Sequence, residues 1–114
     1  LTASGFAGKK GPVLATAVVA GVQGAKRTSS LIPFCHPVAL DACDVSFEEQ
    51  ELALEVTCAV TTTHRTGVEM EALSGASIAA LAVYDMTKAL SHSIRVEDLR
   101  LIEKTGGKSD YHKT

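Results

Sequence analysis

Large aromatic side chains are scarce in this sequence, which has no Trp, two Tyr and three Phe among its 114 residues. By contrast, sixteen residues are Ala. Aromatic residues normally supply much of the buried area of a small core. We therefore expect helices that approach one another closely through small side chains. Helix faces of this kind pack well on several sides at once, which favours contacts between subunits.

A strong charge of one sign and a long hydrophobic run are both absent. Eleven basic and thirteen acidic residues give a net charge of −2, so the basic surplus typical of nucleic-acid and anionic-membrane binders is missing. The longest uncharged runs, 11–25 and 72–84, hold 15 and 13 residues, whereas spanning a bilayer takes roughly 20. We expect no nucleic-acid partner, no membrane helix and a cytoplasmic location, or the mitochondrial matrix in a eukaryote.

The three cysteines do not form a pattern that stabilises a small secreted domain. Cys35, Cys43 and Cys58 are odd in number and show no C-x-x-C spacing, which argues against a disulfide framework or a zinc ribbon. A chain of this length is near the commonest domain size and can build its own core. We expect one domain over 1–114, no metal site, and cysteines that serve as packing residues.

Hydrophobic periodicity predicts the order helix, strand, strand, helix, strand. The elements are a helix over 12–27, strands over 38–48 and 52–62 joined by a turn at 48–51, a helix over 68–90 and a strand over 94–101. This is a ferredoxin-like βαββαβ unit without its first strand, which lies upstream or is supplied by residues 2–6. The prediction is an α+β fold, with an antiparallel sheet and helices packed on one face.

Asp85 and Lys88 are the first candidates for chemistry. They lie three residues apart on the second helix and therefore share a face. An exposed ion pair is one interpretation, and it would contribute little. The other follows from apolar residues on every side of this helix, which indicate burial against a partner subunit. A buried lysine shifts its pKa readily and suits proton transfer.

A second set of candidates surrounds the start of the same helix. Glu69 and Glu71 either favour the positive end of the helix dipole or place two carboxylates at a cleft, as acid, base or cation ligands. Pro33 and Pro37 enclose His36 in a stiff, extended loop, which displays this side chain as a proton donor or an anion contact.

Four blocks of sequence resemble the MoaC family, the cyclic pyranopterin monophosphate synthases. They occur in the family's order and together span about 10–112. The blocks are Ala25–Thr28 with Leu31–Pro37, Thr66–Leu73, Tyr84–Ala89 and Lys104–Ser109. Several long motifs at consistent spacing make the resemblance specific. The family's N-terminal segment is absent from this sequence, and we expect it in the natural protein.

The resemblance implies a lyase of molybdenum cofactor biosynthesis. Its substrate would be 3′,8-cyclo-7,8-dihydro-GTP, which a radical-SAM enzyme makes from GTP. Its products would be cyclic pyranopterin monophosphate and pyrophosphate. The implied assembly is a homo-hexamer, a trimer of dimers, with active sites at the dimer interfaces. No cofactor is required, although Mg²⁺ can accompany the pyrophosphate.

Family motifs also imply the roles of individual residues. Asp85 and Lys88 would be catalytic, with Lys88 the main general acid or base. The substrate-binding residues would be Lys10, His36, Glu69, Met70, Glu71 and Lys104. The cations among them could neutralise a triphosphate and the departing pyrophosphate.

Two other classes of function compete with this interpretation. A ferredoxin-like regulatory module could use the same basic residues to sense a nucleotide without changing it, and it would need no acid–base couple. A purely structural oligomer would tolerate neutral replacements at all these positions. An enzyme would not.

Overall fold

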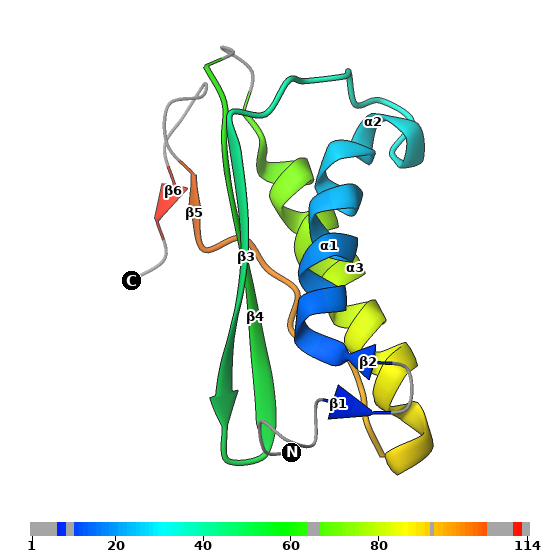
Figure 1. Ribbon diagram of the computed structural model, residues 1–114. Helices are drawn as coiled ribbons and strands as arrows, with labels where there is room; N and C mark the ends of the chain where they lie inside the picture. The colour runs from blue at the N-terminus through cyan, green and yellow to red at the C-terminus, as the bar shows by residue number, and fades with distance from the viewer. Residues whose placement is uncertain (1–6, 9–10, 64–66, 92, 105–110, 113–114) are drawn as a thin grey trace.

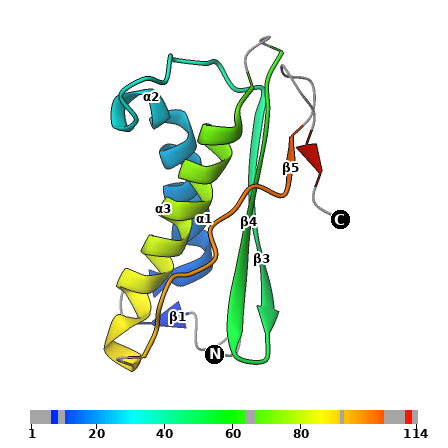
Figure 2. The same cartoon turned by 180° about the vertical axis from the view of Figure 1, so that it is seen from behind.

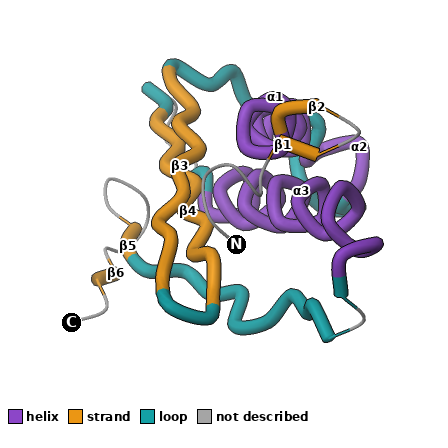
Figure 3. Tube along the Cα trace, turned by 60° about the horizontal axis from the view of Figure 1, so that its bottom comes forward, coloured by secondary structure: helices purple, strands orange, loops and turns teal. Residues whose placement is uncertain are grey.

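Two long helices lie side by side against one face of an antiparallel hairpin (Figure 1). The computed structural model describes residues 7–8, 11–63, 67–91, 93–104 and 111–112. In a second view, both helices again lie on the same side of the hairpin (Figure 3). The fold is therefore α+β with helices on one face, as predicted, and its centre is the helix–strand–strand–helix portion of a ferredoxin-like unit.

The first long helix, α1, comprises Val13–Lys26. Pro12 precedes it in extended geometry, with φ −68° and ψ 109°, where the missing N–H of proline costs no helical hydrogen bond. Its buried residues recur every three to four positions and are mostly small: Val13, Ala17, Gly21, Gly24 and Ala25. A four-residue helix, α2 (Thr28–Leu31), follows at once.

Glycines allow the close approach of the two helices and the sheet. A Cβ atom at Gly24 would lie 2.7 Å from Cγ1 of Ile78 on the other long helix, and one at Gly75 would lie 2.5 Å from Sγ of Cys58 on the hairpin. Real carbon atoms do not approach so closely. The prediction that small side chains replace aromatics in this core is therefore confirmed.

Strands β3 (Ala42–Gln50) and β4 (Ala53–Thr61) form the hairpin, with Ala42 opposite Thr61 and Gln50 opposite Ala53. Along both strands, half-buried residues alternate with exposed ones over most of their length. The predicted turn at 48–51 is wrong: the ladder continues to Gln50, and the turn is Glu51–Leu52. Glu48 and Glu49 can belong to the strand because their positions are exposed to solvent.

The second long helix, α3, comprises Glu69–Thr87 and continues as a 3₁₀ helix, η2, over Lys88–Leu90. Its buried residues form a single stripe: Glu71, Gly75, Ala79 and Thr87. Leu81 is 52% exposed. Burial on every side, expected from the sequence, does not occur within one chain, because only α1 and the hairpin cover this helix.

The predicted strand over 94–101 is wrong. These residues are irregular, and the chain returns along the hairpin to β5 (Glu103–Lys104), as Figure 2 shows. Asp98 has a positive φ of 59°, a conformation that interrupts an extended strand and that aspartate tolerates better than most residues. Val96 and Leu99 are 48% and 55% exposed, so the alternating pattern exists without a neighbouring strand to bury it.

The remaining strands are short and pair only with one another among the described residues. β1 (Ala7–Gly8) pairs with β2 (Gly11–Pro12), and β5 pairs with β6 (Tyr111–His112). The proposed first-strand stub over 2–6 lies outside the described residues. None of the described helices has the length and apolar character needed to cross a membrane.

Candidate functional site

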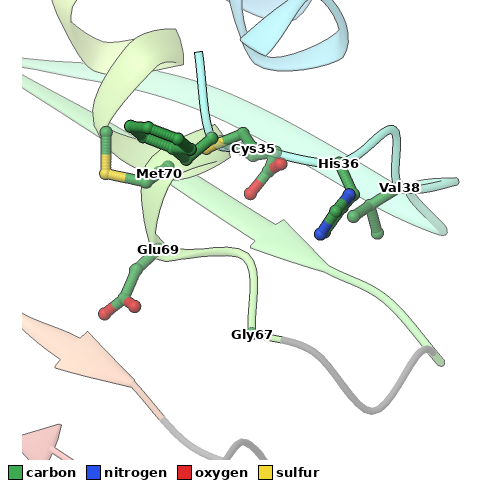
Figure 4. A pocket seen from close by; sticks show the side chains of 8 residues that line it. Cys35, His36, Val38, Gly67, Glu69 and Met70 are labelled. Carbon is green, nitrogen blue, oxygen red and sulfur yellow. The ribbon is translucent and has the colours of Figure 1, made fainter. Parts of the chain in front are cut away.

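A pocket of about 190 Å³ lies between the loop after α2 and the first turn of α3 (Figure 4). Eight residues line it: Phe34, Cys35, His36, Val38, Gly67, Glu69, Met70 and Glu71. Half of them were predicted to bind substrate, namely His36, Glu69, Met70 and Glu71. The structure therefore brings together residues from two sequence motifs that are more than thirty positions apart.

One wall of the pocket is a tight turn. The backbone N–H of Cys35 donates to the carbonyl of Ile32 at 3.1 Å, which closes a β-turn with Pro33 and Phe34 at its centre. Proline favours the first central position because its φ is already correct. The turn presents His36, which is exposed, at the pocket, as expected of a loop between two prolines.

The opposite wall is the N-terminus of α3. Glu69 and Glu71 both lie in its first turn, and the side chain of Val68, the residue before the helix, does not cap it. The Glu71 residue is only 5% exposed, while Glu69 is half-buried. Negative charge is favourable at this end of the helix dipole. Both interpretations of the sequence thus apply, because these carboxylates suit the helix terminus and also line a pocket.

Asp85 and Lys88 form an ion pair at the other end of α3. Lys88 Nζ lies 2.8 Å from Asp85 Oδ1, and the side chains are 55% and 58% exposed, respectively. Within one chain the pair is exposed, because the buried stripe of α3 includes neither residue. Burial against a partner subunit stays a prediction. The hydrogen bond to Asp85, together with the charge of its carboxylate, raises the pKa of Lys88 above its ordinary value. The amine is therefore an ammonium at neutral pH.

Distance separates the two halves of the predicted site. Glu69 and Asp85 are sixteen residues apart on one helix, which at 1.5 Å per residue places them about 24 Å apart along its axis. One chain therefore holds a carboxylate-lined pocket at one end of α3 and the ion pair at the other.

Two predicted lysines add nothing to this geometry. Lys10 lies outside the described residues, and Lys104 belongs to β5, where only its backbone is described. Within the described part of the chain, no three His, Cys, Asp or Glu side chains are placed to hold a metal ion.

Four lining residues were not predicted to bind substrate: Phe34, Cys35, Val38 and Gly67. Among them, Phe34 has a large side chain that is almost fully exposed. The only sequence signal for Phe34 was an aromatic side chain directly after the first proline of a stiff loop, in a sequence where aromatics are few.

A comparison with models of known protein families assigns the chain to a family. The MoaC family model matches residues 4–107. The chain belongs to the MoaC family. Within the family it is 54% identical over 111 residues to the cyclic pyranopterin monophosphate synthase of Xanthomonas oryzae pv. oryzae (strain MAFF 311018), covering 96% of this chain and 67% of that protein.

Relatives of similar identity occur in other bacteria. The cyclic pyranopterin monophosphate synthase of Heliobacterium modesticaldum is 53% identical over 105 residues, covering 90% of this chain and 66% of that protein. The molybdenum cofactor biosynthesis bifunctional protein of Synechocystis is 49% identical over 111 residues, covering 93% of this chain and 32% of that protein. This MoaC chain thus spans about two thirds of the length of the single-function relatives.

Proposed function

We propose that the chain is a cyclic pyranopterin monophosphate synthase, a lyase of molybdenum cofactor biosynthesis. The observation that carries the proposal is 54% identity to a relative of that name over 96% of the chain. The reaction would convert 3′,8-cyclo-7,8-dihydro-GTP, supplied by a radical-SAM enzyme in the cytoplasm, to cyclic pyranopterin monophosphate and pyrophosphate.

The active site would combine two protomers. A pocket of about 190 Å³ is smaller than the roughly 300–1,000 Å³ typical of sites for drug-sized ligands, so it would hold only part of a nucleotide. The ion pair lies about 24 Å along α3 from the pocket. In an antiparallel two-fold dimer, Asp85 and Lys88 of one protomer would lie at the pocket of the other. Because each contact across a two-fold interface occurs twice, the dimer would contain two such sites. Three dimers would form the hexamer.

Charge suggests which end of the substrate each half would bind. The carboxylates of Glu69 and Glu71 would repel a triphosphate and would accept hydrogen bonds from the N–H groups of the heterocycle. Lys88, as an ammonium, would face the phosphates together with Lys10 and Lys104, whereas His36 lines the pocket.

The chemistry needs proton transfers and one phosphoryl transfer. A hydroxyl oxygen would attack the α-phosphorus as its bond to the pyrophosphate oxygen breaks, so positive charge beside the leaving group would stabilise the transition state. Lys88 is protonated at neutral pH and could therefore donate a proton as the general acid, while Asp85 would hold it in place. No resident cofactor is proposed, and Mg²⁺ would at most accompany the pyrophosphate.

The test is to incubate the purified protein with the cyclised GTP intermediate and to measure pyrophosphate and the pterin product together. Both should appear in the wild type and be lost in Lys88→Ala. Arg95→Ala is the matched control, because Arg95 forms an exposed ion pair with Glu97 at 3.2 Å elsewhere in the chain. An intermediate that binds but stays intact would instead indicate the regulatory module.

A further inference from the structure

Phe34 is held in water by a rigid turn. The residue is 96% exposed, although it is one of only three Phe in a chain without Trp. Its neighbour Pro33 and the hydrogen bond from Cys35 to Ile32 restrict the backbone on both sides. A large aromatic side chain normally gains stability by burial. Folding alone therefore does not explain this residue.

The residues around Phe34 are better suited to binding a flat polar ligand than to binding an apolar side chain. Phe34 shares the pocket with His36, Met70 and the two first-turn carboxylates. Figure 4 shows His36 and Cys35 on one wall and Glu69 and Met70 on the other. An aromatic face beside carboxylate acceptors is complementary to a flat heterocycle that carries N–H groups on its edge.

We infer that Phe34 is a positioning residue whose ring stacks on the nitrogen heterocycle of the substrate. This inference rests on the proposed function and adds to it the contact that orients the flat part of the molecule. The turn holds the ring in place before the substrate arrives, so little side-chain freedom is lost on binding. Stacking needs only a π-face, so an aromatic replacement should serve and an aliphatic one should not.

The first test compares Phe34→Ala and Phe34→Tyr in the purified oligomer. Phe34→Ala should weaken substrate binding about 10- to 100-fold, the range that loss of one base–aromatic stack produces, and the oligomeric mass should not change. Phe34→Tyr should remain within about threefold of wild type because the π-face is retained. Leu52→Ala is the control, since Leu52 is 98% exposed at the far hairpin turn.

A fluorescence experiment tests contact directly. Because the sequence has no Trp, Phe34→Trp would carry the only indole of the protein. Adding the cyclised GTP intermediate should change its emission, whereas Leu52→Trp should not respond.

The outcomes separate this inference from the proposed function. Normal affinity in Phe34→Ala would overturn the inference while wild-type turnover leaves the function intact. Dissociation of the oligomer with unchanged affinity would overturn it in favour of a subunit contact. Binding that Phe34→Trp reports, without any turnover in the wild type, would support the stacking contact and reject the synthase. A wild type that does not bind the intermediate would reject both.

Discussion

The thiols of Cys43 and Cys58 lie 3.9 Å apart on the hairpin, and that of Cys58 packs against Gly75 of α3. Burial is the main cause that raises the pKa of Cys58 from 9.0 to about 12, and the neighbouring Cys43 adds to it. The thiolate is the reactive form of cysteine, so Cys58 is an inert thiol at neutral pH. This agrees with the packing role predicted for it from the strand pattern.

Stability should fall at high pH because of Cys58. The unfolded thiol loses its proton near pH 9 while the folded one keeps it until about pH 12, so the folded state binds more protons in this window. The stabilisation is complete below pH 9 and is lost as the pH rises toward 12. Urea unfolding at pH 8, 9 and 10 should show this decline, and Cys58→Ala should show a shallower one. Equal slopes would contradict the assignment.

The ion pair of Lys88 with Asp85 leads to a second prediction about single residues, which concerns the pKa of Lys88. Asp85→Asn removes the charge that helps to hold the proton on Lys88, so the pKa of the amine should fall toward 10.5. NMR titration of the Lys88 side chain measures the shift directly. Turnover should also fall, with its basic pH limit displaced to lower pH. A variant whose pH profile matches that of wild type would show that Asp85 does not position Lys88.

At the scale of elements, α1 and α3 pack closely against each other at Gly24. Gly24→Ala would place a carbon atom 2.7 Å from Ile78, and overpacking of this kind typically costs about 1–3 kcal/mol of unfolding free energy. Val19→Ala, at a position 57% exposed on the same helix, should change stability by less than about 0.5 kcal/mol. Urea denaturation of both variants measures the difference. Equal stability of the two would show that the helices are not packed as closely as described.

Local signals explain which elements the sequence predicted. Pro12 and the helical spacing of small residues define α1, and strict alternation defines β3 and β4. The strand predicted over 94–101 depended on alternation alone, but a strand also requires a neighbour with which to pair. That information is not local, and Asp98 in the left-handed region gave no warning in the pattern.

The same limit applies to the candidate site. The two motifs around His36 and Glu69 were predicted separately, and only the fold shows that they line one pocket. The burial of Lys88 could not be judged from the apolar composition of its helix, because burial depends on which elements cover each face. Phe34 was missed because exposure is also a property of the folded chain.

At the scale of the whole molecule, one chain keeps the two halves of the predicted site apart. The pocket and the ion pair are at opposite ends of α3, and apolar side chains such as Leu81 and Leu90 are 52% and 64% exposed. Both features are expected of a subunit that is completed by a partner. The proposed hexamer predicts a particle of six 11.9 kDa chains in sedimentation, and a monomer would contradict it.

Subunit mixing tests the central claim, a site shared between protomers. His36→Ala destroys the pocket end and Lys88→Ala the ion-pair end, so each variant alone should be inactive. When the two are unfolded together and reassembled, half of the randomly formed dimers contain one chain of each kind, and each of these has one intact site. The mixture should recover about a quarter of wild-type turnover. A mixture that forms the same oligomer yet stays inactive would contradict the shared site.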